Sequence, residues 1–334
     1  MNILCSADWH LTVAQPKRRL DVFPETQEGK IDWILETARR RKCRAVVLAG
    51  DLTDHPKLPY HITRKYMSKF RRLTINLMME PDPAIPIYAV MGQHDLRYHT
   101  NPMNTPFATI CAGAGLILLN DQPEEINPID DGCYFYGYSW NDKDYPQVRR
   151  KQENTCHILV AHKMVIEDER LWDGQENYVS ATNLLRTLPD FDLIITGDNH
   201  LTFTANTENR ALINPGSIMR WKKDQIDHKP CVFIVDTDTL HWDIEYIPIE
   251  PASKVFDLGK MAEDEEKGKR MSAWIETLEK GTDMPDLKFV ENLKIYIKAN
   301  KVEPGVIGLM EEATGEYLSG KRRFRAARSV DPGS

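Results

Sequence analysis

Five short apolar runs in the first two hundred residues each end in a group of polar side chains. The runs lie at 2–7, 44–50, 85–92, 155–162 and 191–197. Segments with helical spacing of their apolar residues fall between them, at 29–43 and, as a long and basic segment, at 60–79. Strands that alternate with helices predict a layered α/β sheet.

The polar groups at the ends of these runs consist of residue types that bind metals. They are Asp8-Trp9-His10, Gly50-Asp51-Leu52-Thr53-Asp54, Gly92-Gln93-His94-Asp95, Ala161-His162-Lys163 and Gly197-Asp198-Asn199-His200. Each group alone is more often a turn or a surface histidine than a site. In an α/β sheet, however, ligands gather at the carboxyl ends of the strands. Five such groups in succession therefore predict one shared metal site.

The pattern changes after residue 200. Short strand-like runs joined by turns between 200 and 250 predict an antiparallel meander that completes a second sheet. A boundary near 249–254 divides the chain into a main domain, 1–250, and a small α+β accessory domain, 251–320. The accessory domain contains a charged helix and a half-exposed strand at 292–298, and a basic tail follows at 321–334.

Composition excludes several classes of protein. Apolar residues make up 41% of the chain and charged residues 28%, which is ordinary for a globular protein. The net charge of -7 argues against a uniformly basic surface but permits a local basic groove. No apolar run approaches the ~18 residues of a membrane span, and the six cysteines form no CxxC pair. We expect a cytoplasmic protein with free thiols.

The order of the motifs resembles the calcineurin-like metallophosphoesterases, whose motifs are D-x-H, G-D-x-x-D, G-N-H-D/E, a lone H and G-H/D-x-H. The resemblance spans residues 8–200, and Asn214-Pro215-Gly216-Ser217 is similar to the turn that follows the last motif. It implies a four-layer α/β/β/α sandwich with a centre of two divalent metal ions.

The stretches Asp8-Trp9-His10-Leu11 and His94-Asp95-Leu96-Arg97-Tyr98 are most similar to the nuclease subunits of Mre/SbcD-type double-strand-break repair complexes and their phage recombination counterparts. This resemblance implies a DNA exonuclease or endonuclease, and it makes 251–320 a DNA-capping domain. It also implies a separate SMC-like ATPase partner and a homodimer formed through the region of 60–79. The chain has no GxxxxGK[ST] motif of its own.

The family roles can be carried over residue by residue. One metal ion would be held by Asp8, His10, Asp51 and His200, and the other by Asp51, Gln93, His162 and Asp198. Asp51 would bridge the two ions, and His94, oriented by Asp54, would protonate the leaving oxygen. Mixed nitrogen and oxygen ligands favour manganese, iron or zinc over magnesium or calcium, and we expect manganese.

Two positions depart from the family pattern. Gln93 stands where the family has asparagine, so the same amide oxygen lies one methylene further from the backbone. Asp198 stands where many members have histidine, which adds a carboxylate to the centre. We expect the two departures to compensate in part, a looser amide ligand beside a stronger anionic one.

Arg97, Arg220 and Trp221 are candidates for substrate binding, the two arginines on phosphate and the tryptophan on a base or a ribose. The alternative for the arginines is solvated surface charge. Two other functions remain open: a protein phosphatase or small-molecule phosphodiesterase with the same centre, and a weakly active scaffold that binds DNA ends and an ATPase.

Overall fold

The computed structural model describes residues 1–75, 83–98, 102, 104–122, 124–126, 132–148, 155–167, 176–207, 209–221, 225–280 and 297. Met1–Asp257 form one compact unit and a second unit begins at Leu258. Within the described residues, no helix is both long enough and apolar enough to cross a membrane.

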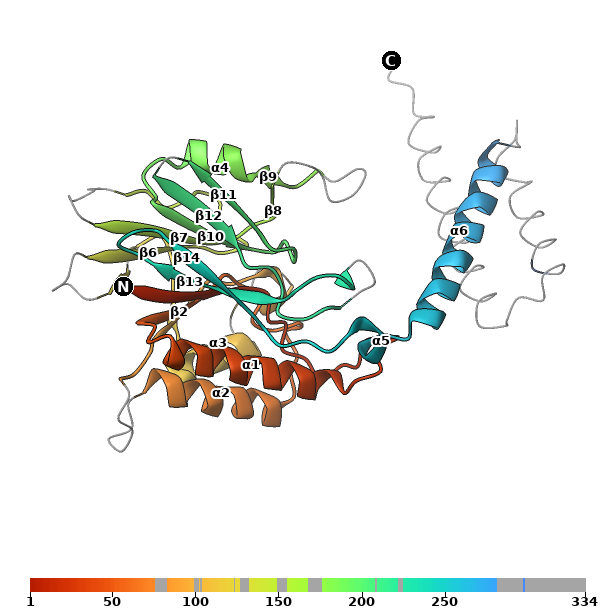
Figure 1. Ribbon diagram of the computed structural model, residues 1–334, viewed down its shortest axis with the longest axis horizontal. Coiled ribbons are helices and arrows are strands. Elements are labelled where there is room, and N and C mark those ends of the chain that lie inside the picture. Colours follow the sequence, from red (N-terminus) through yellow and green to blue (C-terminus); the bar gives the residue numbers. More distant parts are fainter. Residues whose placement is uncertain are drawn as a thin grey trace, which may run out of the picture. The chain divides into compact units, whose positions relative to one another are not determined.

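The first unit contains two six-stranded sheets (Figure 1). The first sheet has the order β14(Trp242–Tyr246), β13(Cys231–Asp236), β1(Asn2–Ser6), β2(Ala45–Leu48), β3(Ile87–Ala89), β4(Ile117–Leu118). Strands β1 to β4 are parallel, and β13 is antiparallel to β1. Helices α1(Phe23–Arg40), α2(Tyr60–Thr74) and α3(Pro106–Ala114) cover its outer face.

The second sheet has the order β11(Phe203–Thr207), β12(Arg210–Asn214), β10(Leu193–Gly197), β7(Cys156–His162), β6(Cys133–Tyr138), β5(Glu124–Ile126). Helix α4(Ala181–Thr187) packs on its outer face, beside the small pair β8(Val165–Ile166) and β9(Val179–Ser180). The predicted four-layer α/β/β/α sandwich is therefore confirmed, and the five apolar runs become β1, β2, β3, β7 and β10.

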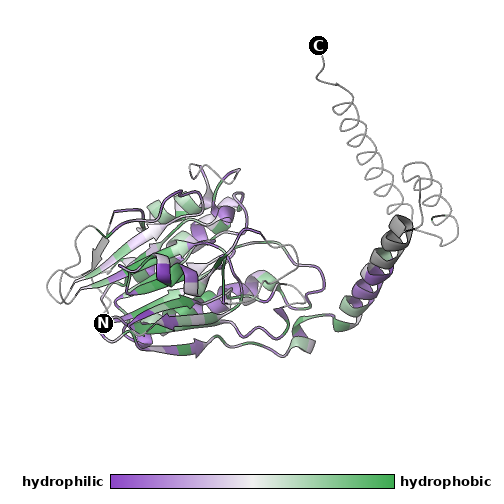
Figure 2. Cartoon of the chain, turned by 90° about the horizontal axis from the view of Figure 1, so that it is seen from above, coloured by the Kyte–Doolittle hydropathy of each residue, from purple (hydrophilic) through white to green (hydrophobic). Residues whose placement is uncertain are grey.

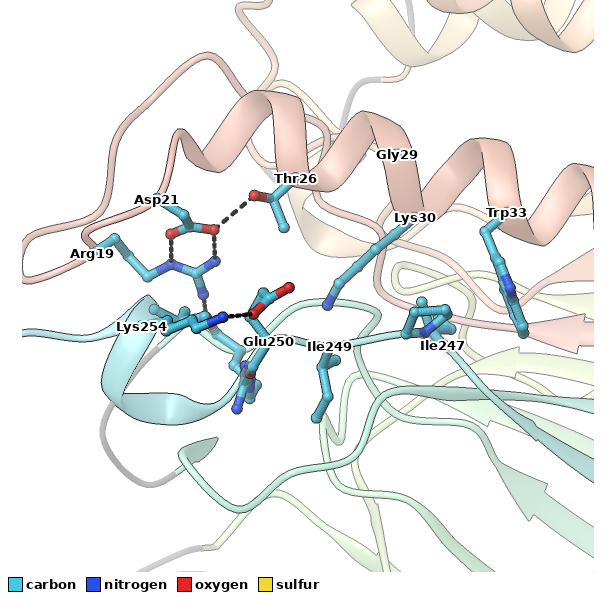
Figure 3. Close-up of a pocket in the computed structure, with 13 residues that line it drawn as sticks. Arg19, Asp21, Thr26, Gly29, Lys30, Trp33, Ile247, Ile249, Glu250 and Lys254 are labelled. Atoms are coloured by element: carbon cyan, nitrogen blue, oxygen red, sulfur yellow. Dashed lines mark hydrogen bonds and ion pairs between the residues drawn. The ribbon is translucent and has the colours of Figure 1, made fainter.

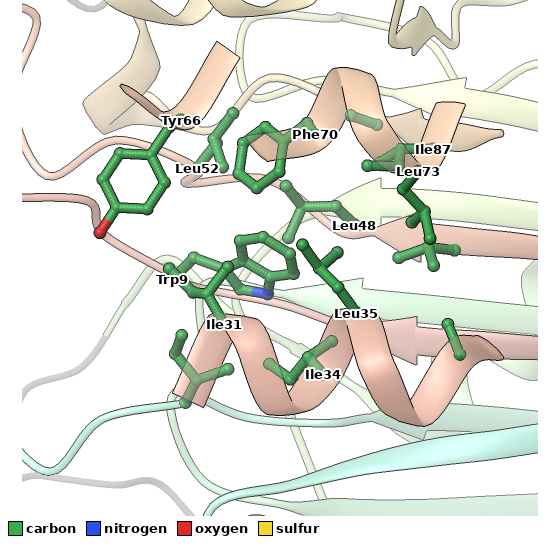
Figure 4. Packing of buried hydrophobic residues seen from close by; sticks show 14 of the residues in the cluster. Trp9, Ile31, Ile34, Leu35, Leu48, Leu52, Tyr66, Phe70, Leu73 and Ile87 are labelled. Atoms are coloured by element: carbon green, nitrogen blue, oxygen red, sulfur yellow. The ribbon is translucent and has the colours of Figure 1, made fainter. Parts of the chain in front are cut away.

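The central strands are apolar throughout because both of their faces are buried. In β2, Val46 and Leu48 pack against the helices, whereas Ala45 and Val47 face the second sheet. Figure 4 shows the helical side of this arrangement, where Trp9, Ile34 and Phe70 fill the space between the first sheet, α1 and α2. Between the sheets, Tyr88 of β3 stacks on Phe135 of β6 with ring centroids 4.9 Å apart.

The prediction that 200–250 forms one antiparallel meander in the second sheet is wrong, because its strands divide between the two sheets. The β11–β12 hairpin joins the second sheet, but β13 and β14 return to the first, where β13 pairs with β1. Strand β12 ends at Asn214 in the second sheet and β13 begins at Cys231 in the first, a connection too long for a tight turn. An apolar strand pattern does not specify which of two sheets a strand joins, because both sheets offer a buried position.

The segment after β14 packs back on the first unit before the second unit begins. Helix α5(Ala252–Val255) follows, Val255 and Phe256 are buried, and Val255 accepts a hydrogen bond from the backbone of Leu20. Helix α6(Leu258–Lys280) is the predicted charged helix, and the part of it that Figure 2 colours by hydropathy is mostly hydrophilic.

Much of the predicted accessory domain and the whole tail 321–334 lie outside the described residues. Of the strand expected at 292–298, only Ile297 is described, and it is helical, so the strand is wrong at that residue. The predicted helix at 60–79 forms as α2 as far as Thr74, and its last residues also lie outside the described part.

Replacing Phe135 by alanine should lower the free energy of unfolding by about 3–5 kcal/mol, because this fully buried ring joins the two sheets. Tyr246→Ala on β14 is the matched control, since that ring is 59% exposed and its loss should change stability by less than about 0.5 kcal/mol. Urea unfolding measures both, and equal effects would contradict the packing described for Phe135.

Candidate metal centre

The predicted ligands converge where the carboxyl ends of strands from both sheets meet. Asp8 and His10 follow β1, Asp51 follows β2, and the turn η1(Gln93–Asp95) follows β3 in the first sheet. From the second sheet come His162, the last residue of β7, and Asp198 and His200, which follow β10. The parallel register of neighbouring strands places these ends at one edge of the sandwich.

Three overlapping groups of potential ligands meet around Asp51 in the described residues, and one of them joins His94 with His10 and Asp51. In another, the ligand atoms of Asp8, His10 and His200 lie within 4.8 Å of one another, and the Nε2 atoms of the two histidines are 3.1 Å apart. Asp8, Asp51 and His162 form the third group of the same kind. Asp51 Oδ2 lies 3.7 Å from His10 Nε2 and 3.4 Å from His162 Nε2, so its carboxylate faces both histidines.

Gln93 lies between two of the other predicted ligands. Its Oε1 is 2.7 Å from His162 Nε2, and its Nε2 donates to Asp198 Oδ1 at 3.0 Å. The amide oxygen therefore points to the side of the centre where the sequence places the second ion. The two departures from the family pattern, Gln93 and Asp198, are direct neighbours.

Unsatisfied polar atoms test whether this centre suits a cation. Asp8 Oδ2, Asp51 Oδ2 and His10 Nδ1 are buried and have no hydrogen-bond partner among the described residues. Buried carboxylate oxygens without partners are costly unless a cation compensates them. Three carboxylates, an amide oxygen and imidazoles with this arrangement fit divalent metal ions with mixed ligands.

Backbone strain is concentrated at the same residues. Asp8, His10, Asp51 and Asp198 have φ angles of 50°, 47°, 49° and 78°, in the left-handed region that side chains other than glycine seldom adopt. Each such residue costs of order 1–3 kcal/mol and persists only where the surrounding structure enforces it. The strands and their hydrogen bonds hold these side chains in place at that cost.

A glycine is required at position 92 because no side chain would fit there, and not because of its backbone conformation. Its φ of -92° and ψ of 175° are open to any residue, but a Cβ there would lie 1.9 Å from Asp51 Oδ1. The same oxygen accepts the backbone N–H of His94 at 3.0 Å. The turn after β3 thus passes directly against the central carboxylate.

The pKa values of the histidines in the centre shift in opposite directions. Burial lowers the pKa of His10 to about 3 and of His200 to about 4, so both rings are neutral and free to act as ligands. Burial also disfavours charge on His162, but Asp51, Asp8 and Asp198 raise its pKa to about 10. A proton on His162 thus balances the carboxylates, and a metal ion must displace it to bind.

His94 has a fixed ring orientation. Its Nδ1 lies 2.8 Å from the backbone carbonyl oxygen of Asp54. A carbonyl oxygen can only accept a hydrogen bond, so Nδ1 carries the proton. The other ring nitrogen, Nε2, lies on the side of the ring away from this carbonyl. The sequence predicted that Asp54 orients this histidine. The structure shows the carbonyl of Asp54 in that role, while its carboxylate oxygen lies 3.8 Å from His10 Nδ1.

Asp95 is a positioning residue that the sequence reasoning left without a role. Its buried carboxylate accepts hydrogen bonds from the Thr53 N–H at 2.8 Å, the Thr53 hydroxyl at 2.9 Å and the Gly92 N–H at 3.0 Å. It therefore ties the turn after β2 to the turn after β3. Burial, then the charge of Asp51, raises its pKa to about 7. The position of Asp95 directly after His94 is the one feature of the sequence that could have indicated this role.

The predicted substrate-binding residues lie in three different environments. Arg97 is exposed, with its guanidinium 5.4 Å from the ring of the neighbouring Tyr98. Arg220 is 4% exposed and donates to the carbonyls of Ile226 and Glu250, so backbone oxygens hold its guanidinium, and its contact with phosphate stays a prediction.

Trp221 packs its ring on other aromatic side chains. Its centroid lies 4.4 Å from that of Phe23 and 5.9 Å from that of His10, and its indole nitrogen is buried without a partner among the described residues. These contacts are tilted and edge-on, with interplanar angles of 54° to Phe23 and 80° to His10, so aromatic neighbours hold the ring beside the candidate centre.

Comparison with known proteins adds independent information. A sequence model of the calcineurin-like phosphoesterase family matches residues 1–202. The DNA double-strand break repair protein Mre11 of Aeropyrum pernix is 36% identical over 97 residues, which span 28% of this chain and 20% of that protein. The chain thus matches only about a fifth of the length of that relative.

Two solved structures are similar at low identity. An archaeal phosphodiesterase is 11% identical, with a TM-score of 0.38 over 74% of this chain and 99% of its own. A 5'-nucleotidase from Staphylococcus aureus, described as putative, is 14% identical, with a TM-score of 0.44 over 75% of this chain and 54% of its own.

Gly92→Ala should lower metal affinity by at least about tenfold, because the new Cβ displaces the Asp51 carboxylate. Gly29→Ala in α1 is the control, since a Cβ there meets nothing within 4 Å and helical alanine stabilises by roughly 0.5–1 kcal/mol. Calorimetric titration with manganese compares the two. Unchanged affinity in Gly92→Ala would contradict the close approach.

Gln93→Asn and Asp198→His should not act independently on manganese affinity, because the two side chains are joined by a hydrogen bond of 3.0 Å. We expect a coupling of about 0.5–3 kcal/mol in the double-mutant cycle. Gln93→Asn combined with Asp238→Asn, an exposed carboxylate in the loop after β13, should be additive. Additive effects in both cycles would show that the two departures do not compensate.

Proposed function

The chain belongs to the calcineurin-like phosphoesterase family, and from this membership we propose that it is a two-metal nuclease that hydrolyses phosphodiester bonds of DNA in recombination or repair. The observation that carries the proposal is the Asp51 carboxylate, whose Oδ2 lies 3.7 Å from His10 Nε2 and 3.4 Å from His162 Nε2, beside the oriented ring of His94. The similarity of 97 residues to a protein named for DNA double-strand break repair supports DNA as the substrate.

Each ligand set has a defined place in this proposal. Asp8, His10 and His200 would hold one ion, Gln93, His162 and Asp198 the other, and Asp51 both. Two divalent ions in such a centre supply a hydroxide nucleophile at neutral pH and neutralise charge on the phosphate. The three carboxylates offset most of the charge of two divalent ions, which favours a hard ion such as manganese.

His94 is the proposed general acid. The Asp54 carbonyl holds the proton on Nδ1, so a second proton on Nε2 makes the ring cationic and ready to donate. Hydrolysis forms a bond from phosphorus to the water oxygen and breaks the bond to the leaving oxygen. The Nε2 proton of His94 then passes to that leaving oxygen.

His94→Ala should reduce hydrolysis by about 10²–10⁴-fold, because the leaving oxygen loses its proton donor while the predicted ligands remain. The assay uses linear duplex DNA and the chromogenic diester bis(p-nitrophenyl) phosphate, each with manganese. His241→Ala, whose side chain is 80% exposed, is the matched control and should retain full activity.

The two substrates separate the alternatives. DNA cleavage that only His94→Ala loses supports the nuclease. Turnover of the diester alone, still without DNA cleavage after an SMC-like ATPase is added, favours a small-molecule phosphodiesterase. Metal binding without turnover of either substrate favours a scaffold for DNA ends.

A further inference from the structure

A cavity lies beside the N-terminal half of α1, and none of the predicted metal ligands lines it. Its volume is about 320 Å³, at the lower end of the range for small-molecule sites. Figure 3 shows its walls, which are α1 on one side and the segment from Ile247 to Lys254 on the other.

Lys30 is the central polar group of this cavity. The residue is 7% exposed, and its side chain extends from α1 into the space in front of Ile249 and Glu250 (Figure 3). Its ammonium donates to the carbonyl oxygen of Ile218 at 2.8 Å. An ammonium group has three N–H donors. Among the described residues the other two donors have no acceptor, so Lys30 can bind a further ligand.

Positive charge exceeds negative charge around Lys30. Arg19 forms a bidentate pair with Asp21, at 2.7 Å and 2.6 Å. Arg220, in contrast, donates to the neutral carbonyl groups of Ile226 and Glu250. Burial, then Arg220 and Arg19, lowers the pKa of Lys30 to about 7. When Lys30 is protonated, the cavity has three cations, Arg19, Lys30 and Arg220. The carboxylate of Asp21 balances one of them, which leaves an excess of two positive charges.

The remaining charged groups at this cavity do not cancel the excess. Glu250 and Lys254 form an ion pair of 3.0 Å with side chains 65% and 70% exposed, so they neutralise each other at the rim. His228, which feels the charge of Lys30, lies with its Nε2 2.8 Å from the Ser217 carbonyl oxygen, and burial lowers its pKa.

We propose that this cavity binds a phosphomonoester dianion that carries a flat apolar group, with the phosphate on Lys30 and the apolar group between Trp33 and Ile247. A dianion matches the excess of two positive charges. Trp33 is three residues after Lys30 and lies on the same face of α1, where both line the cavity. The indole and the buried Ile247 form the apolar part of the wall.

Phenyl phosphate, inorganic phosphate and phenol test the proposal by calorimetric titration in EDTA, which keeps metal ions out of the other centre. Phenyl phosphate should bind, and Lys30→Met should weaken it at least about tenfold, the effect of one charged hydrogen bond. Lys65→Met on α2 is the matched control and should bind as wild type does. Trp33→Leu should weaken phenyl phosphate and leave inorganic phosphate unchanged.

The wild-type protein alone provides a second test, should Lys30→Met fold poorly. Lys30 must be protonated to bind, so affinity should fall by up to tenfold per pH unit as pH rises from about 7.5 to 9. Competition by an oligonucleotide with a 5′-phosphate, but not with a 5′-hydroxyl, would assign the phosphate to a strand end. Competition by neither would assign it to a free small molecule.

Three results would overturn the proposal. They are the absence of binding of phenyl phosphate at millimolar concentration, equal affinity in Lys30→Met and wild type, and binding that does not change between pH 7.5 and 9.

Discussion

The placement of buried carboxylates at one edge of the sandwich is the constraint on which the rest of this structure depends. Asp8 and Asp51 are fully buried, Asp198 is half-buried, and oxygens of the first two have no hydrogen-bond partner in the described part of the chain. Charge of one sign in a weakly polar interior is tolerated only beside an opposite charge. His162 supplies that charge when protonated, and divalent ions supply it in an active phosphoesterase.

This electrostatic requirement explains several local features that would otherwise be defects. Left-handed backbone at Asp8 and Asp51 turns each side chain toward the centre directly after its strand ends. Gly92 leaves room for the carboxylate of Asp51, and Asp95 ties together the turns that carry Asp51 and His94. Strain and close approach persist because the sheets behind them are well packed.

The part of the fold and the site that follows from local pattern could be predicted from the sequence. A buried strand that ends in Gly-Asp or Ala-His identifies a ligand position, since the end of a parallel strand is fixed by the sheet. Arg220 could not be placed in this way. Whether a guanidinium faces solvent or backbone carbonyls depends on Ile226 and Glu250, which no spacing rule relates to it. The same holds for β13, which joins the first sheet because β1 offers it a free edge.

The candidate ligands come from both layers of the sandwich, Asp8, His10, Asp51 and Gln93 from the first sheet and His162, Asp198 and His200 from the second. A metal ion bound by residues of both sheets would therefore cross-link the two sheets. Without the ion, apolar packing holds the sheets together at this edge. Local opening of this edge, the motion that exposes amide protons to exchange, must first release the ion. The free energy of this local opening therefore rises with the concentration of free metal. Local opening of the opposite edge does not depend on the metal concentration.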